Sequence, residues 1–282
     1  SMVNGVYGSE IRDITSGEII KQYELPLYDI SSNGHFGVSL NFSRLQRIRP
    51  GYGYSNLPDW TKGDLMPLED GILLVNLKTG AVEYKLTLDC VLKYPHNYLR
   101  PDSEHYFNHI SFSPDSKKFL FFHLWQNNRR RFSRLLVFDI ETSQLKLIEN
   151  EIIVSHYCWK DNAKIIFTGT NMDGTVGYFL IDIESGERHQ LGAGILDSDG
   201  HPSTISQSTS IISDTYPDQY QERSIFIFNE ENEKVILGVF YSPFKYEGEF
   251  RCDLHPRISR GQNMIAFDSA HSGLRNLYVM GL

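Results

Sequence analysis

The chain has 282 residues, of which 40% are hydrophobic and 13% aromatic. That composition can fill the core of one large β domain or two ordinary ones, and it argues against disorder. Lys and Arg number 27 against 35 Asp and Glu, and the formal net charge of −8 excludes general nucleic-acid binding. A locally basic pocket could still hold an anion.

The sequence also argues against a disulfide-stabilised fold and against a membrane span. Three cysteines are too few, and odd in number, for a disulfide framework. No apolar run approaches the roughly 18–20 residues needed to span a membrane. The N-terminus has no basic n-region and no apolar h-region, so no signal peptide is predicted. The chain is then expected to be cytoplasmic if its start is native, and periplasmic or secreted if a leader was removed.

Alternating strands dominate the chain from its start to its end, in two kinds of unit. One kind is a strand that ends in Asp or Asn, a polar turn and a second strand, which occurs at residues 9–25, 71–86, 134–149, 177–192 and 224–238. The other is a short strand, a polar turn and a very apolar strand, which occurs at residues 28–42, 110–125, 156–170, 201–216 and 255–271. No long stretch has helical periodicity, so helix is predicted to be minor.

Joined in order, the two kinds of unit predict four-stranded antiparallel modules. Such modules, repeating every several tens of residues, are typical of β-propeller blades. Four nearly complete modules begin near Tyr28, His109, His156 and His201. A fifth, from His255, has only three strands, and the N-terminal segment supplies two. The prediction is one all-β propeller domain over residues 1–282, with about five to six blades' worth of chain.

Several motifs resemble those of a known family. The segments FNHISFSPDSKKFLFFHLW, SHYCWKD, DGHPS, SDTYPD and RCDLHPRISRGQNMIAFDSAH occur in this order. Together they resemble the β-propeller polysaccharide lyases, particularly the ulvan-lyase-like group and more distantly oligogalacturonate lyase. That family forms seven-bladed rings, so the chain looks short at its N-terminus. The resemblance implies a lyase that cleaves a uronic-acid-containing, anionic polysaccharide by β-elimination: a base removes the C5 proton, a cation neutralises the carboxylate, and an acid protonates the leaving O4 oxygen.

His109 and His123 are the first candidate catalytic pair. They lie on successive predicted strands across a short turn, and an even separation lets them share a face if the turn keeps the register. Histidine suits proton transfer near neutral pH. The alternative is that each makes a structural hydrogen bond between blades. The resemblance adds Tyr157 as their catalytic partner, in preference to His156, which alternation places on the opposite face.

Candidate substrate-binding residues lie in two places. Arg44, Arg47 and Arg49 stand beside tyrosines in the loop of residues 41–64, and arginine with tyrosine suits sugar and carboxylate recognition. A second basic loop, WQNNRRRFSR, follows at residues 125–134. Tyr216 and Arg223 flank a predicted strand end, where propeller sites gather. The alternative for all of these is a solvated loop or turn.

A structural zinc site is predicted from four side chains: His201, Cys252, His255 and His271. One thiolate and three imidazoles satisfy a tetrahedral site, which would join the last two modules. The resemblance includes a structural zinc in some members. The alternative is a buried apolar cysteine with histidines that serve the blade turns.

One departure from the family leaves a second function open. The segment after SHYCW, where the resemblance places an arginine, contains Lys164 but no arginine. Arg44, Arg47, Arg49, Arg223 and Arg251 are the candidates to replace it. If none does, the chain is a non-catalytic propeller that binds glycan or protein, or one that processes a surface glycan by another reaction.

Overall fold

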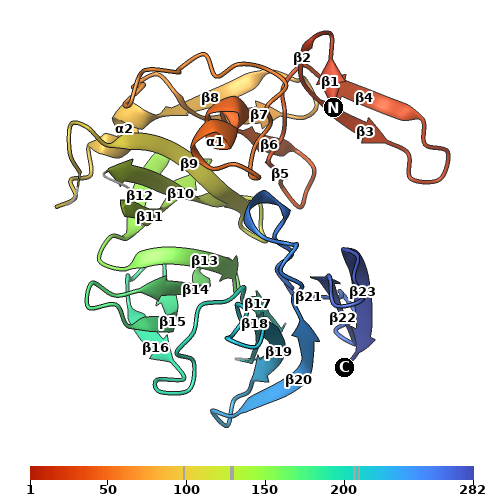
Figure 1. The fold of residues 1–282 in the computed structure, drawn as a ribbon. Helices are drawn as coiled ribbons and strands as arrows, with labels where there is room; N and C mark the ends of the chain where they lie inside the picture. Colours follow the sequence, from red (N-terminus) through yellow and green to blue (C-terminus); the bar gives the residue numbers. More distant parts are fainter. Residues whose placement is uncertain (98, 128–129, 206–207, 209) are drawn as a thin grey trace. The chain divides into compact units, whose positions relative to one another are not determined.

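The computed structural model describes residues 1–97, 99–127, 130–205, 208 and 210–282. The chain forms two compact units, residues 1–150 and 151–282 (Figure 1). Each unit is described by itself, so the expected single domain over residues 1–282 stays a prediction. Asn128 and Arg129 of the second basic loop lie outside the described residues.

The first unit contains two four-stranded antiparallel sheets and two short hairpins. One sheet has the order β5-β6-β7-β8, with strands Asp29–Ile30, Phe36–Ser39, Gly71–Asn76 and Val82–Thr87. The other has the order β12-β11-β10-β9, with strands Gln144–Glu149, Arg130–Asp139, Lys118–Asn127 and Glu104–Phe112. The hairpins pair β1 with β2 and β3 with β4, over Met2–Val3, Val6–Tyr7, Ser9–Arg12 and Ile19–Tyr23.

The second unit contains two four-stranded antiparallel sheets and one three-stranded sheet, in chain order. The strands of the sheet β13-β14-β15-β16 are Ile153–Trp159, Lys164–Thr170, Val176–Asp182 and Arg188–Leu191. Those of the sheet β17-β18-β19-β20 are Ser203–Thr204, Ile211–Asp214, Glu222–Phe228 and Lys234–Tyr241. The last sheet, β21-β22-β23, has three strands, Arg257–Ile258, Met264–Ser269 and Asn276–Gly281.

These sheets confirm the predicted modules and the all-β fold class. Each predicted four-strand module is one sheet, the last has three strands, and the N-terminal segment supplies a hairpin. Helix is minor, as α1 (Phe42–Ile48), α2 (Leu88–Leu92) and η1 (Gly248–Phe250). Helix α1, the longest in the described part of the chain at 7 residues, is far too short to cross a bilayer.

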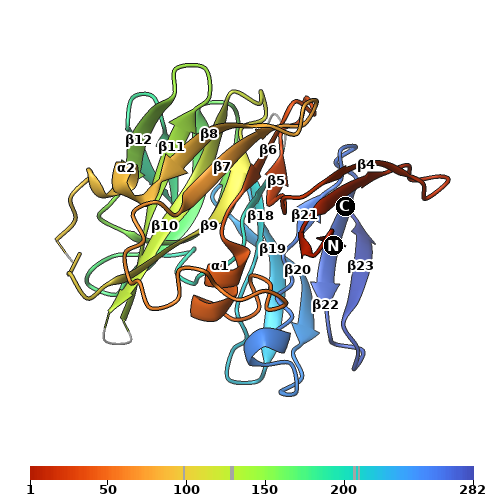
Figure 2. The same ribbon diagram turned by 90° about the horizontal axis from the view of Figure 1, so that it is seen from above.

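Helix α1 lies in a segment that the sequence predicted to be a loop. The side chain of Asn41 caps it by accepting a hydrogen bond from the Arg44 amide, and Leu45 and Ile48 bury its apolar face. The helix packs beside β9, as Figure 2 shows. A helix of two turns leaves too short a periodic pattern to be read from sequence.

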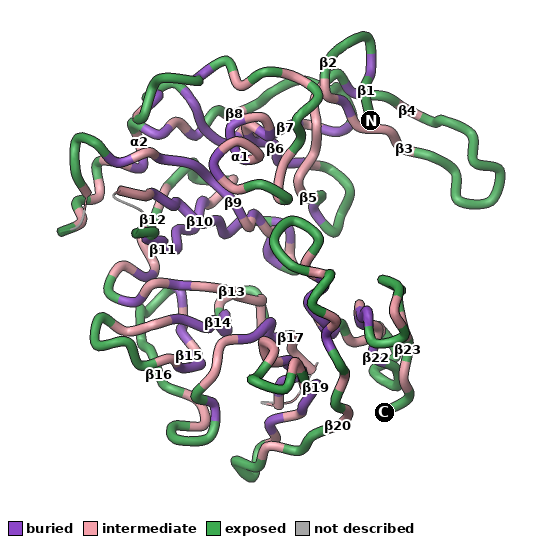
Figure 3. Tube along the Cα trace, in the orientation of Figure 1, coloured by how far each residue is buried: buried purple, intermediate pink, exposed green. Residues whose placement is uncertain are grey.

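Strands β9, β10 and β11 form the most deeply buried part of the first unit (Figure 3). Their aromatic side chains fill the space beside the sheet, with Phe119, Phe121, Phe122 and Phe138 all at 1% exposure or less. The register between β9 and β10 shifts between Leu120 and Phe122, where a β-bulge interrupts the ladder. The bulge re-aims the side chains of β9 beyond it.

Two apolar clusters fill the second unit. The first joins β14, β15, β18 and β19 through buried residues that include Ile166, Tyr178 and Phe226. The second joins the last two sheets through Ile212, Ile225, Leu254, Ile265 and Phe267. Because the second cluster contains Leu254, the chain around Asp253 and His255 is anchored to the core and holds their side chains in place.

Candidate metal centre

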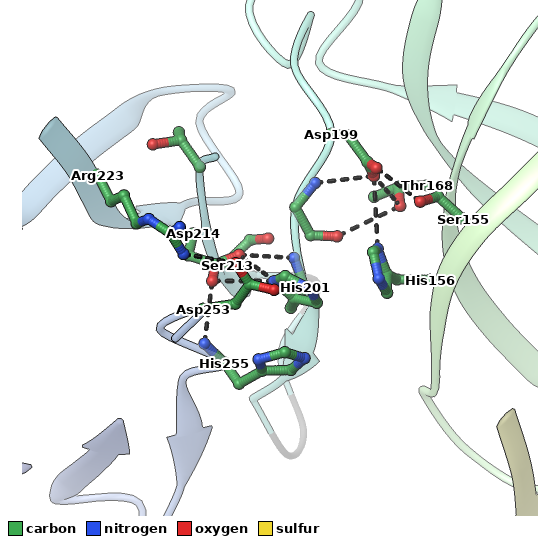
Figure 4. A network of polar contacts seen from close by, with 12 residues as sticks. Ser155, His156, Thr168, Asp199, His201, Ser213, Asp214, Arg223, Asp253 and His255 are labelled. Carbon is green, nitrogen blue, oxygen red and sulfur yellow. Dashed lines mark hydrogen bonds and ion pairs between the residues drawn. The ribbon is translucent and has the colours of Figure 1, made fainter. Parts of the chain in front are cut away.

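Three histidines occupy matching places in the three sheets of the second unit. His156 lies in β13, His201 lies two residues before β17, and His255 lies two residues before β21. Neighbouring first strands contact one another, β13 with β17 and β17 with β21, so the three side chains converge (Figure 4). The ring centroids of His201 and His255 are 3.6 Å apart, and those of His156 and His201 are 4.0 Å apart.

Asp214, the last residue of β18, fixes two of these histidines. Its carboxylate accepts hydrogen bonds from the His201 amide at 2.7 Å, the His201 Nδ1 at 2.8 Å and the His255 amide at 2.9 Å. Asp214 is only 1% exposed. A buried carboxylate that receives Nδ1–H fixes the tautomer, so the lone pair of His201 lies on Nε2.

The Nε2 atom of His201 is buried and has no hydrogen-bond partner among the described residues. A buried polar atom without a partner is costly, and native structures usually supply one. His201, His255 and Asp253 offer one ligand atom each, and these atoms lie within 4.8 Å of one another. An imidazole fixed by a carboxylate on its other nitrogen is the usual form of a metal-binding histidine.

Close backbone packing supports this arrangement at Gly200. A Cβ atom at this position would lie 2.1 Å from the carbonyl oxygen of Asp214 and 2.6 Å from the Tyr178 hydroxyl. Only glycine lets the chain before His201 approach β18 closely enough for Asp214 to bind both the amide and the ring. His255 adopts a positive φ of 42°, which is uncommon for a residue with a side chain and is typical of constrained sites.

Asp253 is held by two arginines. Arg223 donates to its Oδ1, and Arg251 donates from Nε to its Oδ2 at 2.8 Å. Burial alone would raise the pKa of Asp253, but the charges of Arg251 and Arg223 outweigh it and hold that pKa below its usual range. Burial lowers the pKa of His255 to about 4. Two imidazoles and one carboxylate suit a divalent ion such as zinc or manganese.

His156 is positioned by a second buried carboxylate, that of Asp199. Asp199 accepts hydrogen bonds from Ser155 Oγ at 2.6 Å and Thr168 Oγ1 at 2.7 Å, and lies 3.5 Å from His156 Nδ1. Burial would raise the pKa of Asp199, but these interactions, that with His156 first, lower it to about 2. Burial lowers the pKa of His156, which therefore favours its neutral form.

Tyr216 and Arg251 complete the cluster on its more exposed side. The Tyr216 ring centroid lies 5.6 Å from that of His201, and the guanidinium of Arg251 lies 5.0 Å over the Tyr216 ring. The side chain of Arg251 is 35% exposed. Here the structure brings together Tyr216, His201 and His255 from the sequence predictions, with a cation beside them.

The predicted zinc ligands need a correction. The gathered group in the described residues contains His201 and His255 but neither Cys252 nor His271, and Asp253 takes part instead. His271 is exposed and bonds Ser269 Oγ through Nδ1 at 2.8 Å. Cys252 is buried, which raises the pKa of its thiol, and its carbonyl oxygen accepts a hydrogen bond from Arg223. Three ligands leave coordination positions open, unlike the closed structural site that the sequence predicted.

The predicted pairing of His109 with His123 is wrong. The side chain of His123 lies on the face of the sheet that carries Phe107, its partner across β9, whereas the His109 ring packs on Phe122, 4.9 Å away, on the other face. His109 adopts a φ of 51° at the bulge, which reverses the expected parity. Sequence spacing cannot reveal a bulge, so the even separation was misleading.

His123 is instead a structural residue. It is 0% exposed, its Nδ1 accepts from Arg134 Nε at 3.0 Å, and its Nε2 donates to His105 Nδ1 at 3.0 Å. Arg134 in turn donates to the carbonyl oxygens of Tyr94 and Val91. Every ring nitrogen of His123 is thus used inside the sheet.

His156, and not its neighbour Tyr157, contacts the histidine cluster. His156 contacts the cluster, and Tyr157 follows it in β13, where successive side chains face opposite sides. Tyr157 belongs to the second unit, whereas His109 and His123 belong to the first. A catalytic role for Tyr157 stays a prediction that this geometry does not support.

The predicted substrate-binding arginines have different surroundings. Arg44 is 1% exposed and donates to the carbonyl oxygens of His105, Asp64 and Leu65, so it supports the fold instead of binding substrate. Arg223 is also buried, and it holds Asp253. Arg47 pairs with Asp59 and Glu104, whereas Arg49 lies 5.0 Å over the Tyr52 ring.

The sequence reasoning missed the carboxylates. Asp253 stands two residues before His255 in the segment RCDLH. Asp214 was interpreted as a turn residue of SDTYPD. Asp199 precedes the predicted ligand His201 by two residues. A search for acidic residues beside each module's first histidine could have found Asp199 and Asp253, but only the folded sheet brings Asp214 to His255.

Comparison with known proteins places the fold. No protein-family model matches the chain, and no curated protein does. An oligogalacturonate lyase in complex with manganese is similar in structure, with a TM-score of 0.62, 16% identity, and coverage of 90% of this chain and 64% of that one. TolB from Acinetobacter baumannii gives 0.53 and 17%, covering 95% and 55% of the two chains.

Dipeptidyl peptidase 4 of Porphyromonas gingivalis is also similar, with a TM-score of 0.57, 10% identity, and coverage of 99% of this chain and 43% of that one. The chain therefore spans less than two thirds of the length of each of these three proteins. Identities this low show the fold alone. The chain has a β-propeller fold.

Proposed function

We propose that the protein is a metal-assisted lyase that cleaves a uronic-acid-containing glycan by β-elimination. The observation that carries this proposal is the buried Nε2 of His201, which lacks a hydrogen-bond partner and lies beside His255 and Asp253. A second histidine, His156, has its ring 4.0 Å from that of His201. A metal-binding group next to a separate, carboxylate-supported histidine suits abstraction of a proton next to a carboxylate.

Each residue of the cluster has a separate role in the proposed reaction. His201, His255 and Asp253 would hold a divalent ion, zinc or manganese, which when bound supplies Lewis-acid stabilisation of the uronate carboxylate. His156, with Nδ1 toward Asp199, takes the C5 proton at Nε2 as the C4–O4 bond breaks and a C4–C5 double bond forms. We assign the proton for the leaving O4 oxygen to the Tyr216 hydroxyl.

Arg251 is the cation we assign to the substrate carboxylate in place of the arginine missing after SHYCW. Its guanidinium stacks over Tyr216 and is partly exposed, so a planar carboxylate could bind it on the open side. Arginine recognises carboxylates through paired N–H groups. An anionic polysaccharide or oligosaccharide is the expected partner, a class to which the similarity with an oligogalacturonate lyase also points.

A panel of uronate polysaccharides, followed by absorbance of the unsaturated uronate, tests the proposal. The protein is assayed after chelation, then with Mn²⁺ or Zn²⁺ restored. We expect product only with metal, and none from His156→Ala or His201→Ala. His271→Ala is the matched control, because this histidine is exposed and outside the cluster. Absence of product from every substrate with either metal would reject the proposal.

One observation favours the alternative, a propeller that binds glycan or protein without catalysis. The Asp253 carboxylate is already neutralised by Arg223 and Arg251, so it has less charge to offer a metal ion. In that case the same open side would bind an acidic ligand without cleaving it. Saturable binding of a uronate polymer, without unsaturated product in the presence of metal, would favour this function.

A further inference from the structure

One face of the sheet β9–β12 in the first unit carries several polar side chains, and among them the Tyr106 hydroxyl has no hydrogen-bond partner in the described part of the chain. Across its ladder Glu104 lies opposite Gln126, and Gln126 lies opposite Arg131. Tyr106 is two residues from Glu104 in β9. Since cross-strand neighbours and residues two apart share a face, Glu104, Tyr106 and Arg131 project from the same side.

Helix α1 brings further arginine side chains to this side. Arg47 Nη1 donates to Glu104 Oε1 at 2.7 Å, which fixes the end of the helix over the face. Arg49 directly follows the helix as its C-cap residue and lies 5.0 Å over the ring of Tyr52. Arg49 therefore comes to this face from the end of helix α1, and Arg131 comes from strand β11 of the sheet.

The Tyr106 hydroxyl is the unusual group here. Tyr106 is 2% exposed, and its hydroxyl has no hydrogen-bond partner among the described residues. Leaving a hydroxyl buried and unpartnered is unfavourable, so native proteins keep one mainly where a ligand or water completes it. Burial raises the pKa of Tyr106. The Tyr52 ring, over which Arg49 lies, is 6.1 Å from the ring of His109, and His109 packs on Phe122 of the same face of the sheet.

The charge balance at this face favours an anion. Arg47 is neutralised by Asp59 and Glu104. Arg49 and Arg131 have no carboxylate within ion-pair distance in the described part of the chain. Two uncompensated guanidinium groups in a chain of net charge −8 mark a local positive site.

We propose that Arg49, Arg131 and Tyr106 form a second saccharide subsite, which binds the carboxylate of a uronic acid residue. Two guanidinium groups and a phenol O–H supply the donors that a carboxylate accepts, and the ring of Tyr52 offers an apolar surface to the sugar. The choice of a uronate rests on the proposed function. The location of the anion site does not, because every residue in it belongs to the first unit.

Binding without turnover tests the subsite directly. Protein held in EDTA is titrated with sodium galacturonate and sodium glucuronate and followed by NMR, with galactose as the neutral match and sodium sulfate as the competing anion. Saturable binding of either uronate is expected. Arg49→Gln and Arg131→Gln should each weaken it about tenfold or more, the effect of losing a charge-assisted hydrogen bond. Arg12→Gln, an exposed arginine of the same unit, should leave it unchanged.

Tyr106→Phe separates ligand binding from folding. Removing an unpartnered hydroxyl should leave the melting temperature unchanged or raise it, while uronate binding weakens several-fold. A fall in melting temperature with unchanged binding would show that the hydroxyl serves the fold and would overturn its role. Retained binding in both arginine variants, no saturation with either uronate, or equal binding of galactose would overturn the subsite. Sulfate that binds as well as uronate would overturn the carboxylate assignment.

The same experiment distinguishes the subsite from the proposed reaction. His201→Ala should abolish unsaturated product in the lyase assay but bind uronate in EDTA as the unchanged protein does. If no substrate yields product while Arg49→Gln and Arg131→Gln still lose uronate binding, the lyase proposal fails and the subsite stands. If product forms but uronate binding in EDTA does not depend on these arginines, the subsite fails and the lyase stands.

Discussion

Each unit contains a pair of neighbouring histidines, His105 with His123 and His201 with His255. The two pairs differ in the groups that complete their hydrogen bonds. In the first unit, His123 accepts from Arg134 and donates to His105, and the rings stack in parallel 5.1 Å apart. In the second, Asp214 binds Nδ1 of His201 and leaves its Nε2 buried without a partner in the described chain. Both ring nitrogens of His123 have partners within the protein, whereas the Nε2 of His201 has none among the described residues.

The partners explain the difference. An arginine donates hydrogen bonds, so it occupies the lone pair of His123, and no lone pair of that ring remains for a metal ion. A carboxylate accepts a hydrogen bond, so the N–H of His201 lies at Nδ1, beside Asp214, and the lone pair lies at Nε2, beside His255 and Asp253. The charge of the neighbour decides which histidine can bind a metal ion.

Replacing His201 or the neighbouring His156 should have the largest effect on activity. His201→Ala or His156→Ala should lower the rate of unsaturated-product formation by about 10²-fold or more, because each removes a group placed at the reacting atoms. His201→Ala should also lower the free energy of unfolding without metal, because the buried Asp214 loses the hydrogen bond from the ring Nδ1. Initial rates and denaturant melts in EDTA check this. Equal rates for the variants and the unchanged protein would contradict it.

Removing the first pair should affect stability most. His123→Ala opens a cavity and leaves the buried Arg134 Nε without its acceptor, so the free energy of unfolding should fall by about 3 kcal/mol or more. Urea melts measure it. His189→Ala, at an exposed histidine of the second unit, is the control and should have almost no effect. A His123→Ala protein as stable as the parent would show that the saturated pair is not structural.

Acid should destabilise the first pair in a defined window. Burial and the nearby arginines lower the pKa of His105 to about 4 and that of His123 well below its usual range. The unfolded chain therefore binds more protons than the folded one below the ordinary histidine pKa near 6.5. Stability is then full above about pH 6.5 and is lost as the pH falls toward 4.

His105→Asn tests the source of that pH dependence. The Asn side-chain oxygen can replace His105 Nδ1 as acceptor for His123 but cannot titrate in this range. The loss of stability between about pH 6.5 and 4 should therefore become shallower in melts followed across this range. An unchanged slope would place the acid-sensitive groups elsewhere.

The smallest effects are expected where the structure corrected the sequence. Cys252→Ser and His271→Ala should each leave metal content and activity within about twofold of the parent, because neither side chain belongs to the gathered group. Metal analysis and the lyase assay check both. A loss of metal in Cys252→Ser would restore the four-ligand site predicted from sequence.

The fold could be predicted because strand alternation and polar turns are local in sequence. The modules that begin at Tyr28, His109, His156 and His201 are the observed sheets. Helix α1 could not be predicted, because 7 residues leave too short a pattern. The pairing of His109 with His123 failed for a related reason: the bulge and the positive φ of His109 are backbone features that composition does not encode.

The site was predictable only in part. His201 and His255 were found because a histidine begins their modules. Asp214 was set aside because a strand-end aspartate resembles a turn residue, and its three hydrogen bonds to His201 and His255 exist only when two sheets meet. His156 was set aside for its neighbour Tyr157, since alternation says that only one of the two faces a given side but not which one.

The central claim is that the incomplete histidine pair holds a metal ion, and metal content tests it most directly. Untagged protein is dialysed to equilibrium against Mn²⁺ or Zn²⁺ and then analysed by elemental analysis, beside His201→Ala and His271→Ala. We predict close to one ion per chain in the parent and in His271→Ala, and close to none in His201→Ala. No bound metal in the parent, or equal metal in the parent and His201→Ala, would contradict the account.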